Sequence, residues 1–344
     1  MPDTLQSAFP GVRTVQALDL EVLPSGAISR LMVQLAHDGM GQPVSVPVLV
    51  AKGERAGPVF GLTAAVHGNE VNGIPVIHRL FDWIDPATLR GTLVAVVVVN
   101  TDGFGARDRL FDGVDLNHIF PGAADGNAAQ VYVHRFVERV LWQFDYLVDL
   151  HTASTGRINS LYVRADLDNP VASRMARLQR PQIILDDPPS DHTLRGHADE
   201  LGIPAITVEI GNPQRFQPEL IKRSLVGLKA VLGEAGMLTR RKKPVIGAAP
   251  VICSGSRWLY THRGGLLDVH PDTCDRVGRG EVIAELTNIF GDCVHTYEAP
   301  FEGIVIGKSV DPVADTGARI LHLGVIDEEA SSLDSVEMSI EALV

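Results

Sequence analysis

A histidine and a glutamate follow a short apolar segment in the first quarter of the chain. The apolar residues 59–66 lead directly into His67, and Glu70 stands three positions later. On a turn that opens a helix, residues i and i+3 lie on one face, so the imidazole and the carboxylate can hold one ion. A surface helix produces the same spacing by chance, so the pair needs support from elsewhere in the chain.

Two later apolar segments supply that support. The segment 145–150 leads into His151, and the segment 203–210 contains Glu209. Together, His67, Glu70 and His151 make the His₂Glu ligand set of catalytic zinc, which leaves a fourth position for water. Zinc lowers the pKa of such a water to about 7, and a nearby free carboxylate can accept its proton during attack on a carbonyl. We therefore predict one Zn²⁺ per subunit, with Glu209 as the candidate base.

Alternating elements must bring these residues together. Near-continuous apolar segments are typical of parallel strands that are covered on both faces. They occur at 59–66, 93–100, 145–150 and 203–210, and helical patterns occur at 71–84, 128–143 and 218–236. Ligands of such sheets bind beyond the carboxyl ends of the strands. We predict an α/β fold with a mixed, mostly parallel sheet and helices on both faces.

The pattern changes after the basic segment RRKKP at 240–244, which is either a linker or a solvated helix end. Beyond it the helical patterns vanish, and Gly and Pro punctuate short β segments, which is typical of a small all-β unit. We predict two domains, a catalytic domain at 1–240 and a β-rich C-terminal domain at 241–344.

Composition excludes several functions. The 344 residues are 45% hydrophobic and 21% charged, as in globular proteins, and the net charge of −12 argues against a sequence-independent nucleic-acid binder. The longest apolar run, Leu93–Val99, is far shorter than the ~20 residues that cross a bilayer, and we expect no signal peptide. Three widely spaced cysteines fit neither a disulfide framework nor a thiolate zinc site and indicate the cytoplasm.

Four motifs carry a resemblance to a known family. AVHGNEVNGIPVI, VVNTDGFGARDRLFDGVDLNHIFPG, DLHT and GIPAITVEIG occur in this order. They resemble the succinylglutamate desuccinylase/aspartoacylase family, a branch of the zinc carboxypeptidase-like fold, over about residues 40–330. The resemblance implies that His67, Glu70 and His151 hold zinc. It also implies that Glu209 activates the water and then protonates the leaving amine.

The same resemblance assigns residues to the substrate. It implies that Arg109 polarises the scissile carbonyl and stabilises the oxyanion; Arg107 is the rival, and the spacing to Asp115-Leu116-Asn117 favours Arg109. Asn117 matches a substrate-contacting asparagine; the alternative is an asparagine that caps a loop. Asp149, two residues before His151, is either an outer partner of a zinc ligand or a buried structural residue.

One position departs from the family. The family motif D-L-N-R ends in an arginine that binds a substrate carboxylate, and this chain has His118 there. A neutral imidazole does not replace a permanently charged planar guanidinium. Either Arg195 supplies the charge, unless it is only an exposed helix residue, or the substrate lacks that carboxylate. His118 and Arg195 are kept as candidate substrate-binding residues.

The C-terminal segment is similar to the lipoyl/biotinyl-type β-fold, notably in its AP-x-x-G-x-V turn. Carrier domains of that type expose a modifiable lysine, and the corresponding hairpin at Asn288–Val294 has none. We expect a structural lobe that borders the active site and restricts access, unless it serves assembly alone.

These observations predict a zinc-dependent amidohydrolase that deacylates a small N-acylated amino acid or diamino acid. The alternatives are a zinc carboxypeptidase acting on short peptides and a non-catalytic metal-binding relative. The expected partner is a small-molecule N-acyl substrate, without nucleic acid or membrane. A homo-oligomer is compatible with the sequence, which does not identify the acyl group or the amine.

Overall fold

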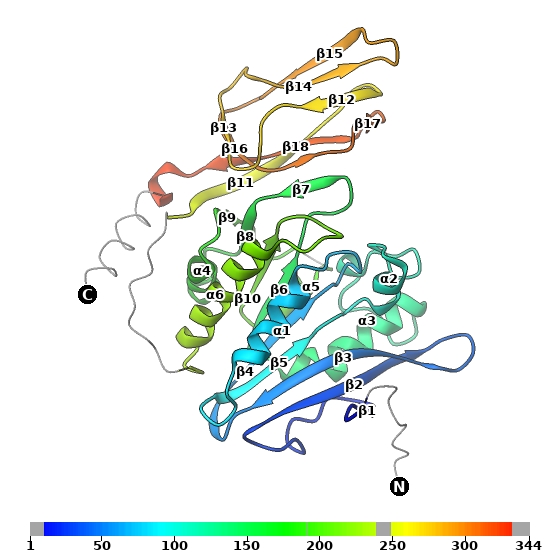
Figure 1. The fold of residues 1–344 in the computed structure, drawn as a ribbon, viewed down its shortest axis with the longest axis vertical. Coiled ribbons are helices and arrows are strands. Elements are labelled where there is room, and N and C mark those ends of the chain that lie inside the picture. Colours follow the sequence, from blue (N-terminus) through cyan, green and yellow to red (C-terminus); the bar gives the residue numbers. More distant parts are fainter. Residues whose placement is uncertain (1–9, 191, 239–248, 332–344) are drawn as a thin grey trace.

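The structure is a computed structural model of the chain, and it describes residues 10–190, 192–238 and 249–331. The helices are α1 (Gly73–Trp83), α2 (Thr101–Ala106), α3 (Ala128–Arg139), α4 (Pro170–Gln179), α5 (Leu194–Glu200) and α6 (Pro218–Glu234) (Figure 1). The strands before residue 240 are β1 (Arg13–Val15), β2 (Ala27–His37), β3 (Pro43–Lys52), β4 (Arg55–Ala64), β5 (Arg90–Val96), β6 (Tyr146–His151), β7 (Arg157–Asn159), β8 (Leu161–Ala165), β9 (Ile183–Asp186) and β10 (Ala205–Ile210).

A mixed sheet forms the body of the protein, with strand order β1-β2-β3-β5-β4-β6-β10-β8-β9. Its centre is parallel, because β4 pairs with β5 and β6 in parallel and β6 pairs with β10 in parallel. Antiparallel pairs flank this centre, namely β3 with β5 on one side and β8 with β10 on the other. The predicted mixed α/β sheet is therefore confirmed.

Helices cover both faces of this sheet, also as predicted. One apolar core contains the buried residues of α1, α4 and α6, and a second contains those of α3 and α5. In α1 the buried residues Ile74, Ile77 and Leu80 recur at three-residue intervals, so one stripe of the helix faces the sheet. The predicted helix at 128–143 is shorter than expected. It ends at Arg139 and is followed by the 3₁₀ turn Leu141–Gln143.

The remaining strands build a β lobe. They are β11 (Val251–Tyr260), β12 (Gly265–Val269), β13 (Arg276–Val277), β14 (Val282–Thr287), β15 (Cys293–Glu298), β16 (Gly303–Ser309), β17 (Val313–Ala314) and β18 (Arg319–Ile326). A four-stranded sheet, β15-β14-β12-β17, encloses an apolar core with strands β18 and β16. The predicted all-β C-terminal lobe is confirmed.

The lobe is tied to the body by two strand pairings. Strand β11 pairs with β9 in parallel, so the large sheet continues into β11-β18-β16-β13, and β7 of the body pairs with β16 of the lobe. This places β7 and the lobe side by side (Figure 1). The basic segment 240–244 lies outside the described residues, so the domain boundary at 240/241 stays a prediction.

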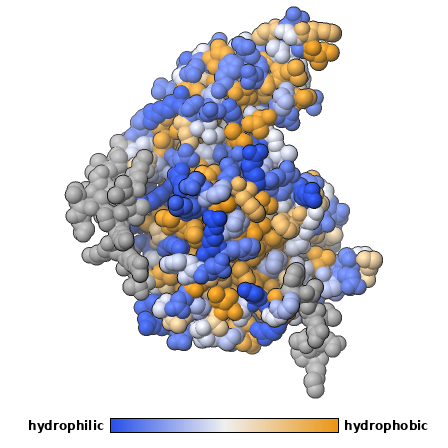
Figure 2. All heavy atoms as spheres, viewed as in Figure 1, coloured by the Kyte–Doolittle hydropathy of each residue, from blue (hydrophilic) through white to orange (hydrophobic). Residues whose placement is uncertain are grey.

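The surface mixes polar and apolar side chains over the face shown in Figure 2. Within residues 10–190, 192–238 and 249–331, no helix combines the length and apolar character that a membrane crossing requires.

Candidate active site

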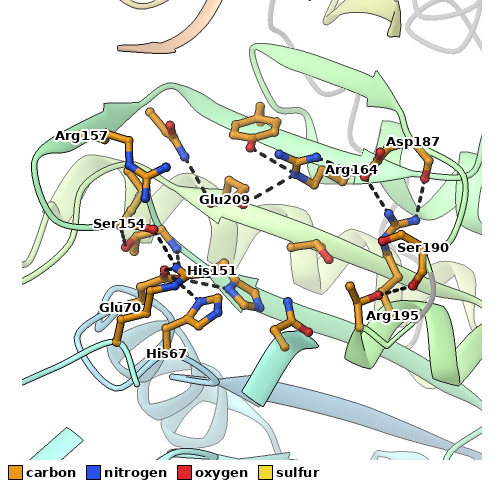
Figure 3. A pocket seen from close by; sticks show the side chains of 18 of the residues that line it. His67, Glu70, His151, Ser154, Arg157, Arg164, Asp187, Ser190, Arg195 and Glu209 are labelled. Atoms are coloured by element: carbon orange, nitrogen blue, oxygen red, sulfur yellow. Dashed lines mark hydrogen bonds and ion pairs between the residues drawn. The ribbon is translucent and has the colours of Figure 1, made fainter. Parts of the chain in front are cut away.

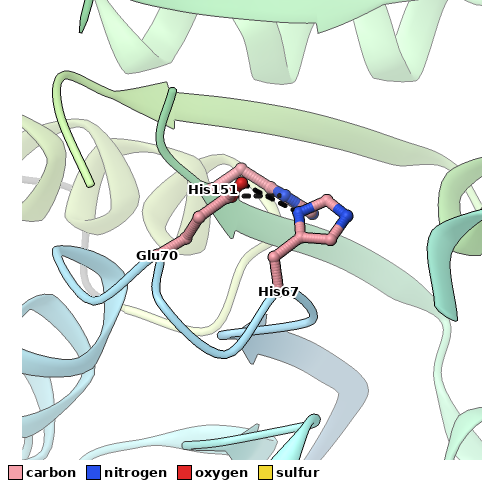
Figure 4. A group of neighbouring side chains, drawn as sticks. All are labelled: His67, Glu70 and His151. Atoms are coloured by element: carbon pink, nitrogen blue, oxygen red, sulfur yellow. Dashed lines mark hydrogen bonds and ion pairs between the residues drawn. The ribbon is translucent and has the colours of Figure 1, made fainter. Parts of the chain in front are cut away.

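Three buried side chains meet at the carboxyl ends of β4 and β6 (Figure 4). His67 and Glu70 lie on the loop between β4 and α1, and His151 is the last residue of β6. His67 Nδ1 lies 2.9 Å from Glu70 Oε1, and His151 Nδ1 lies 3.0 Å from Glu70 Oε2. One ligand atom from each residue falls within 4.8 Å of the others, as a shared ion requires. The three residues expected to hold zinc are therefore brought together.

The state of the ring nitrogens tests whether this group fits a metal ion. His67 Nδ1 is buried and has no hydrogen-bond partner, since Glu70 lies close but outside hydrogen-bonding geometry. On the far side of each ring, His67 Nε2 contacts Asp115 Oδ1 at 3.1 Å and His151 Nε2 contacts Asp149 Oδ2 at 2.6 Å. Such carboxylates favour the proton on Nε2 and leave the Nδ1 lone pair for a metal. The donor set fits catalytic zinc.

The carboxylates around His67 and His151 control the protonation of both imidazole rings. Burial opposes protonation of the His67 and His151 imidazoles, but the surrounding carboxylates outweigh it and raise the pKa of both rings. A metal ion binds deprotonated ligands, so its binding would release these protons.

Asp149 is fixed from two sides. Its Oδ2 contacts His151, and its Oδ1 accepts a hydrogen bond of 2.6 Å from the Thr63 hydroxyl. Thr63 of β4 and Asp149 of β6 are register partners, so the sheet itself sets this contact. Of the two interpretations of Asp149, the geometry favours the outer partner of His151, the candidate metal ligand.

Arg109 enters the site, and Arg107 does not line it. The Arg109 guanidinium contacts Glu70 Oε1 at 3.0 Å, Asp115 Oδ2 at 2.9 Å and Ser154 Oγ at 2.7 Å. Arg107 instead ends α2 in a left-handed conformation. Asp115 thus connects Arg109 to His67, which fixes the arginine beside the three candidate metal ligands His67, Glu70 and His151 (the metal-ligand group below).

Glu209 lies on β10, the strand next to β6, where it is the register partner of His151. Its Oε2 accepts a hydrogen bond of 3.3 Å from Asn159, and its Oε1 lies 3.8 Å from Arg164 Nε. Burial raises the pKa of the Glu209 carboxyl, and the charges of His151 and Arg164 offset this only in part. A raised pKa suits a group that must both accept and return a proton near neutral pH.

The three candidate substrate-binding residues differ in their exposure and in the hydrogen bonds that they already make within the protein. Asn117 Oδ1 accepts a hydrogen bond of 2.8 Å from the backbone N–H of Leu194, so this oxygen is already engaged in fixing the loop before α5. The His118 side chain is 71% exposed and lies at the rim. Arg195 is buried, and its guanidinium donates to the carbonyl and carboxylate oxygens of Asp187, both at 2.7 Å. Their roles stay predictions.

One cavity of about 270 Å³ is lined by all the candidate site residues, namely His67, Glu70, Arg109, Asn117, His118, His151, Arg195 and Glu209. Figure 3 shows the His67 and Glu70 end on one side and the Asp187–Arg195 pair on the other. The β lobe contributes Trp258 and Arg319 to the wall. The lobe therefore borders the cavity that contains the metal-ligand group.

Several residues in or beside the cavity have no role predicted from the sequence. Asp115 stands in the same motif as Asn117, and this motif was the available signal for it. Ser154 follows His151 by three residues, so the neighbouring motif was the signal for it. The others offered no local signal, because they reach the cavity only through the packing of distant segments; they are Arg157, Arg164, Asp187, Trp258 and Arg319.

Comparison with known proteins gives the family. The model of the succinylglutamate desuccinylase/aspartoacylase catalytic domain matches residues 56–235, just over half of the 344 residues. This chain belongs to that family. One relative, the N-alpha-acetyl-L-2,4-diaminobutyric acid deacetylase of Halomonas elongata, is 25% identical over 308 residues, covering 84% of this chain and 87% of the relative.

Solved structures of similar proteins confirm the fold of this desuccinylase/aspartoacylase family member. The product-bound ectoine utilization protein EutE of Ruegeria pomeroyi aligns with a TM-score of 0.80 at 21% identity, over 88% of this chain and 98% of that one. The succinylglutamate desuccinylase/aspartoacylase of Rhodobacter sphaeroides aligns with a TM-score of 0.80 at 20% identity, over 92% and 99%.

Proposed function

We propose that this protein is a zinc-dependent amidohydrolase that removes the acyl group from a small N-acylated amino acid or diamino acid. The observation that carries the proposal is the buried His67–Glu70–His151 group, in which His67 Nδ1 lacks a hydrogen-bond partner, in one cavity with the mostly buried carboxylate of Glu209. The Halomonas elongata relative is a deacetylase of an N-acetyl diamino acid, which supports this substrate class.

In the proposed hydrolysis, each group of site residues has a separate role. When held by His67, Glu70 and His151, Zn²⁺ would act as a Lewis acid and lower the pKa of a bound water. Glu209 accepts a proton from the attacking water and returns it to the amine nitrogen as the C–N bond breaks. Arg109, oriented by Asp115, donates to the carbonyl oxygen as negative charge develops there.

The β lobe favours small substrates over peptides. Trp258 and Arg319 of the lobe form part of the wall of this cavity of about 270 Å³, which supports a small substrate rather than a peptide chain. A zinc carboxypeptidase acting on short peptides remains the alternative with the same ligands.

A hydrolysis screen separates these functions. We expect the zinc-loaded protein to cleave members of a panel of N-acyl amino acids and N-acyl diamino acids, and to leave short peptides intact. We also expect His67→Ala to lose its zinc in elemental analysis. Cleavage of peptides alone would favour the carboxypeptidase, and stoichiometric zinc without any hydrolysis would favour the non-catalytic relative.

A further inference from the structure

The cavity is lined by more arginines than its acidic residues pair with. Five arginines line it, on both the body and the lobe: Arg109, Arg157, Arg164, Arg195 and Arg319. Arg109 pairs with Glu70 and Asp115, Arg195 pairs with Asp187, and Arg164 lies against Asp187 and Glu209.

Arg157 and Arg319 are different. Within the part of the chain that the structure describes, neither guanidinium has an ion pair or a hydrogen bond to protein, and both contact the ring of Trp258. The Cζ atom of Arg157 lies 5.5 Å from the ring centroid, and that of Arg319 lies 5.2 Å from it. In Figure 3 the guanidinium of Arg157 points toward the cavity.

Trp258 is held rigidly beneath these charges. Its register partner on β18, His322, stacks on it with ring centroids 4.7 Å apart and an interplanar angle of 8°. Burial, reinforced by the nearby arginines, lowers the pKa of His322 well below its ordinary value, so this imidazole is neutral. It neither adds to the positive charge nor compensates it.

We propose that Arg157 and Arg319 form a carboxylate-binding subsite over Trp258, on the lobe side of the cavity. The proposal rests on the proposed function for the identity of the substrate that brings the carboxylate. Charge-assisted bonds between guanidinium and carboxylate are among the strongest hydrogen bonds in proteins, and two arginines can hold both oxygens. Burial lowers the pKa of Arg157, and repulsion from the positive charge of Arg319 lowers it further. A bound carboxylate would relieve this repulsion.

This subsite would replace the carboxylate-binding arginine that the family motif has at the position of His118. The fixed charge that the family motif places there is supplied here from β7 and β18, with Arg195 already engaged by Asp187. The carboxylate can belong to the amino-acid part of the substrate or to a dicarboxylic acyl group, and both present the same chemistry to the arginines.

Paired substrates test the subsite and separate these sources. The first pair is an N-acetyl amino acid and its carboxamide, and the second is an N-succinyl and an N-acetyl derivative of one amine. We expect Arg157→Gln and Arg319→Gln each to lower kcat/KM for the carboxylate member of one pair by about tenfold or more, mainly through KM, with the neutral member little changed. The first pair responds if the amino acid supplies the carboxylate, and the second responds if the acyl group does.

Two further variants make the result specific. Arg157→Lys should recover part of the loss because it keeps the charge. Arg257→Gln removes the same charge from the neighbouring position on β11, where the arginine lies near Phe301, and should behave as wild type. Equal losses for both members of each pair, or no change in either ratio, would overturn the subsite.

A binding measurement separates the subsite from the catalytic proposal. The chain has three tryptophans, and Trp83 and Trp142 are exposed and do not line this cavity. We expect succinate to change the fluorescence of the zinc-loaded protein, and the change to be lost in Trp258→Phe and weakened in Arg319→Gln. If the protein hydrolyses no amide but shows this response, the proposed function fails and the subsite stands. A response that Arg157→Gln and Arg319→Gln leave unaltered overturns the subsite.

Discussion

The carboxylate of Asp149 contacts Nε2 of His151 at 2.6 Å, on the side of the ring opposite to Glu70. This contact orients the imidazole and fixes its tautomer, so it should set the affinity of the site for zinc. We expect Asp149→Asn to weaken zinc binding by roughly 10–100-fold, as measured by competition with a chelator.

The matched control for this variant is Asp145→Asn. Asp145 precedes β6 at its other end, where its carboxylate accepts a hydrogen bond from the backbone of Val59. Wild-type zinc affinity in Asp149→Asn would show that the contact with His151 does not support the metal.

Arg109 should act on the rate rather than on the metal content. Removal of one donor to a developing oxyanion costs ~10²–10³ in rate, or about 3–4 kcal/mol. We expect a loss of this size in kcat for Arg109→Ala, with zinc still bound in elemental analysis. Arg107→Ala is the control, because Arg107 lies two residues away but ends α2 outside the cavity wall. Comparable losses in both variants would remove Arg109 from its proposed role.

The pH dependence of kcat/KM should report Glu209. Burial raises its pKa, and the positive charge of Arg164, 3.8 Å away, acts in the opposite direction. The base must be deprotonated to accept a proton, so activity falls as the pH drops through this pKa. Arg164→Met removes the stabilising charge, so we expect the pKa to rise and the acidic limb of the profile to move to higher pH.

Arg164→Lys is the control for that shift because it retains the positive charge, and its acidic limb should stay near that of the wild type. An acidic limb that does not move in Arg164→Met would mean that the profile reports another group.

The ends of the central strands are the part of the site that the sequence predicts well. Strands β4, β6 and β10 are buried on both faces and therefore read as apolar segments, and each ends close to a chemically active residue. Their parallel pairing follows from the alternation with helices, so it brings His67, His151 and Glu209 to one edge. Local pattern and sheet topology agree there, which explains why the proximity of His67, Glu70 and His151 could be predicted.

The rest of the cavity depends on contacts that local patterns do not encode. Trp258 and Arg319 reach it only because β11 pairs with β9 and β7 pairs with β16. Such pairings join short segments far apart in the chain, and tertiary packing selects them rather than propensity. The burial of Arg195 against Asp187 has the same origin, since an arginine on a helix is ordinarily expected to be exposed.

The glycine-rich segment after Asn100 is another place where local sequence patterns do not predict the structure. Gly103 and Gly105 are typical of turns, yet they lie within helix α2. The Asn100 side chain caps that helix by accepting a hydrogen bond of 2.7 Å from Gly103 N, and its own amide donates to the carbonyl of Arg109. The cap offsets part of the low helix propensity of the two glycines, and it depends on the contact between Asn100 and Gly103 rather than on the glycines themselves.

Helix α2 also packs against the loop that contains the candidate ligands His67 and Glu70, which gives a last prediction. A Cβ atom on Gly68, between His67 and Glu70, would lie 2.0 Å from Gly103 C and 2.1 Å from Phe104 N. These are backbone atoms, so the loop itself must move and carry both ligands with it. We expect Gly68→Ala to lower the free energy of unfolding by about 1–3 kcal/mol, measured in urea, and to weaken zinc binding.

Gly105→Ala is the matched control, because a Cβ on Gly105 meets nothing within 4 Å. Alanine is also the better helix former, by up to about 1 kcal/mol, so this variant should be neutral or slightly more stable, with unchanged zinc affinity. If Gly68→Ala matched Gly105→Ala in both measurements, the close approach of α2 would not be what fixes His67 and Glu70 in position.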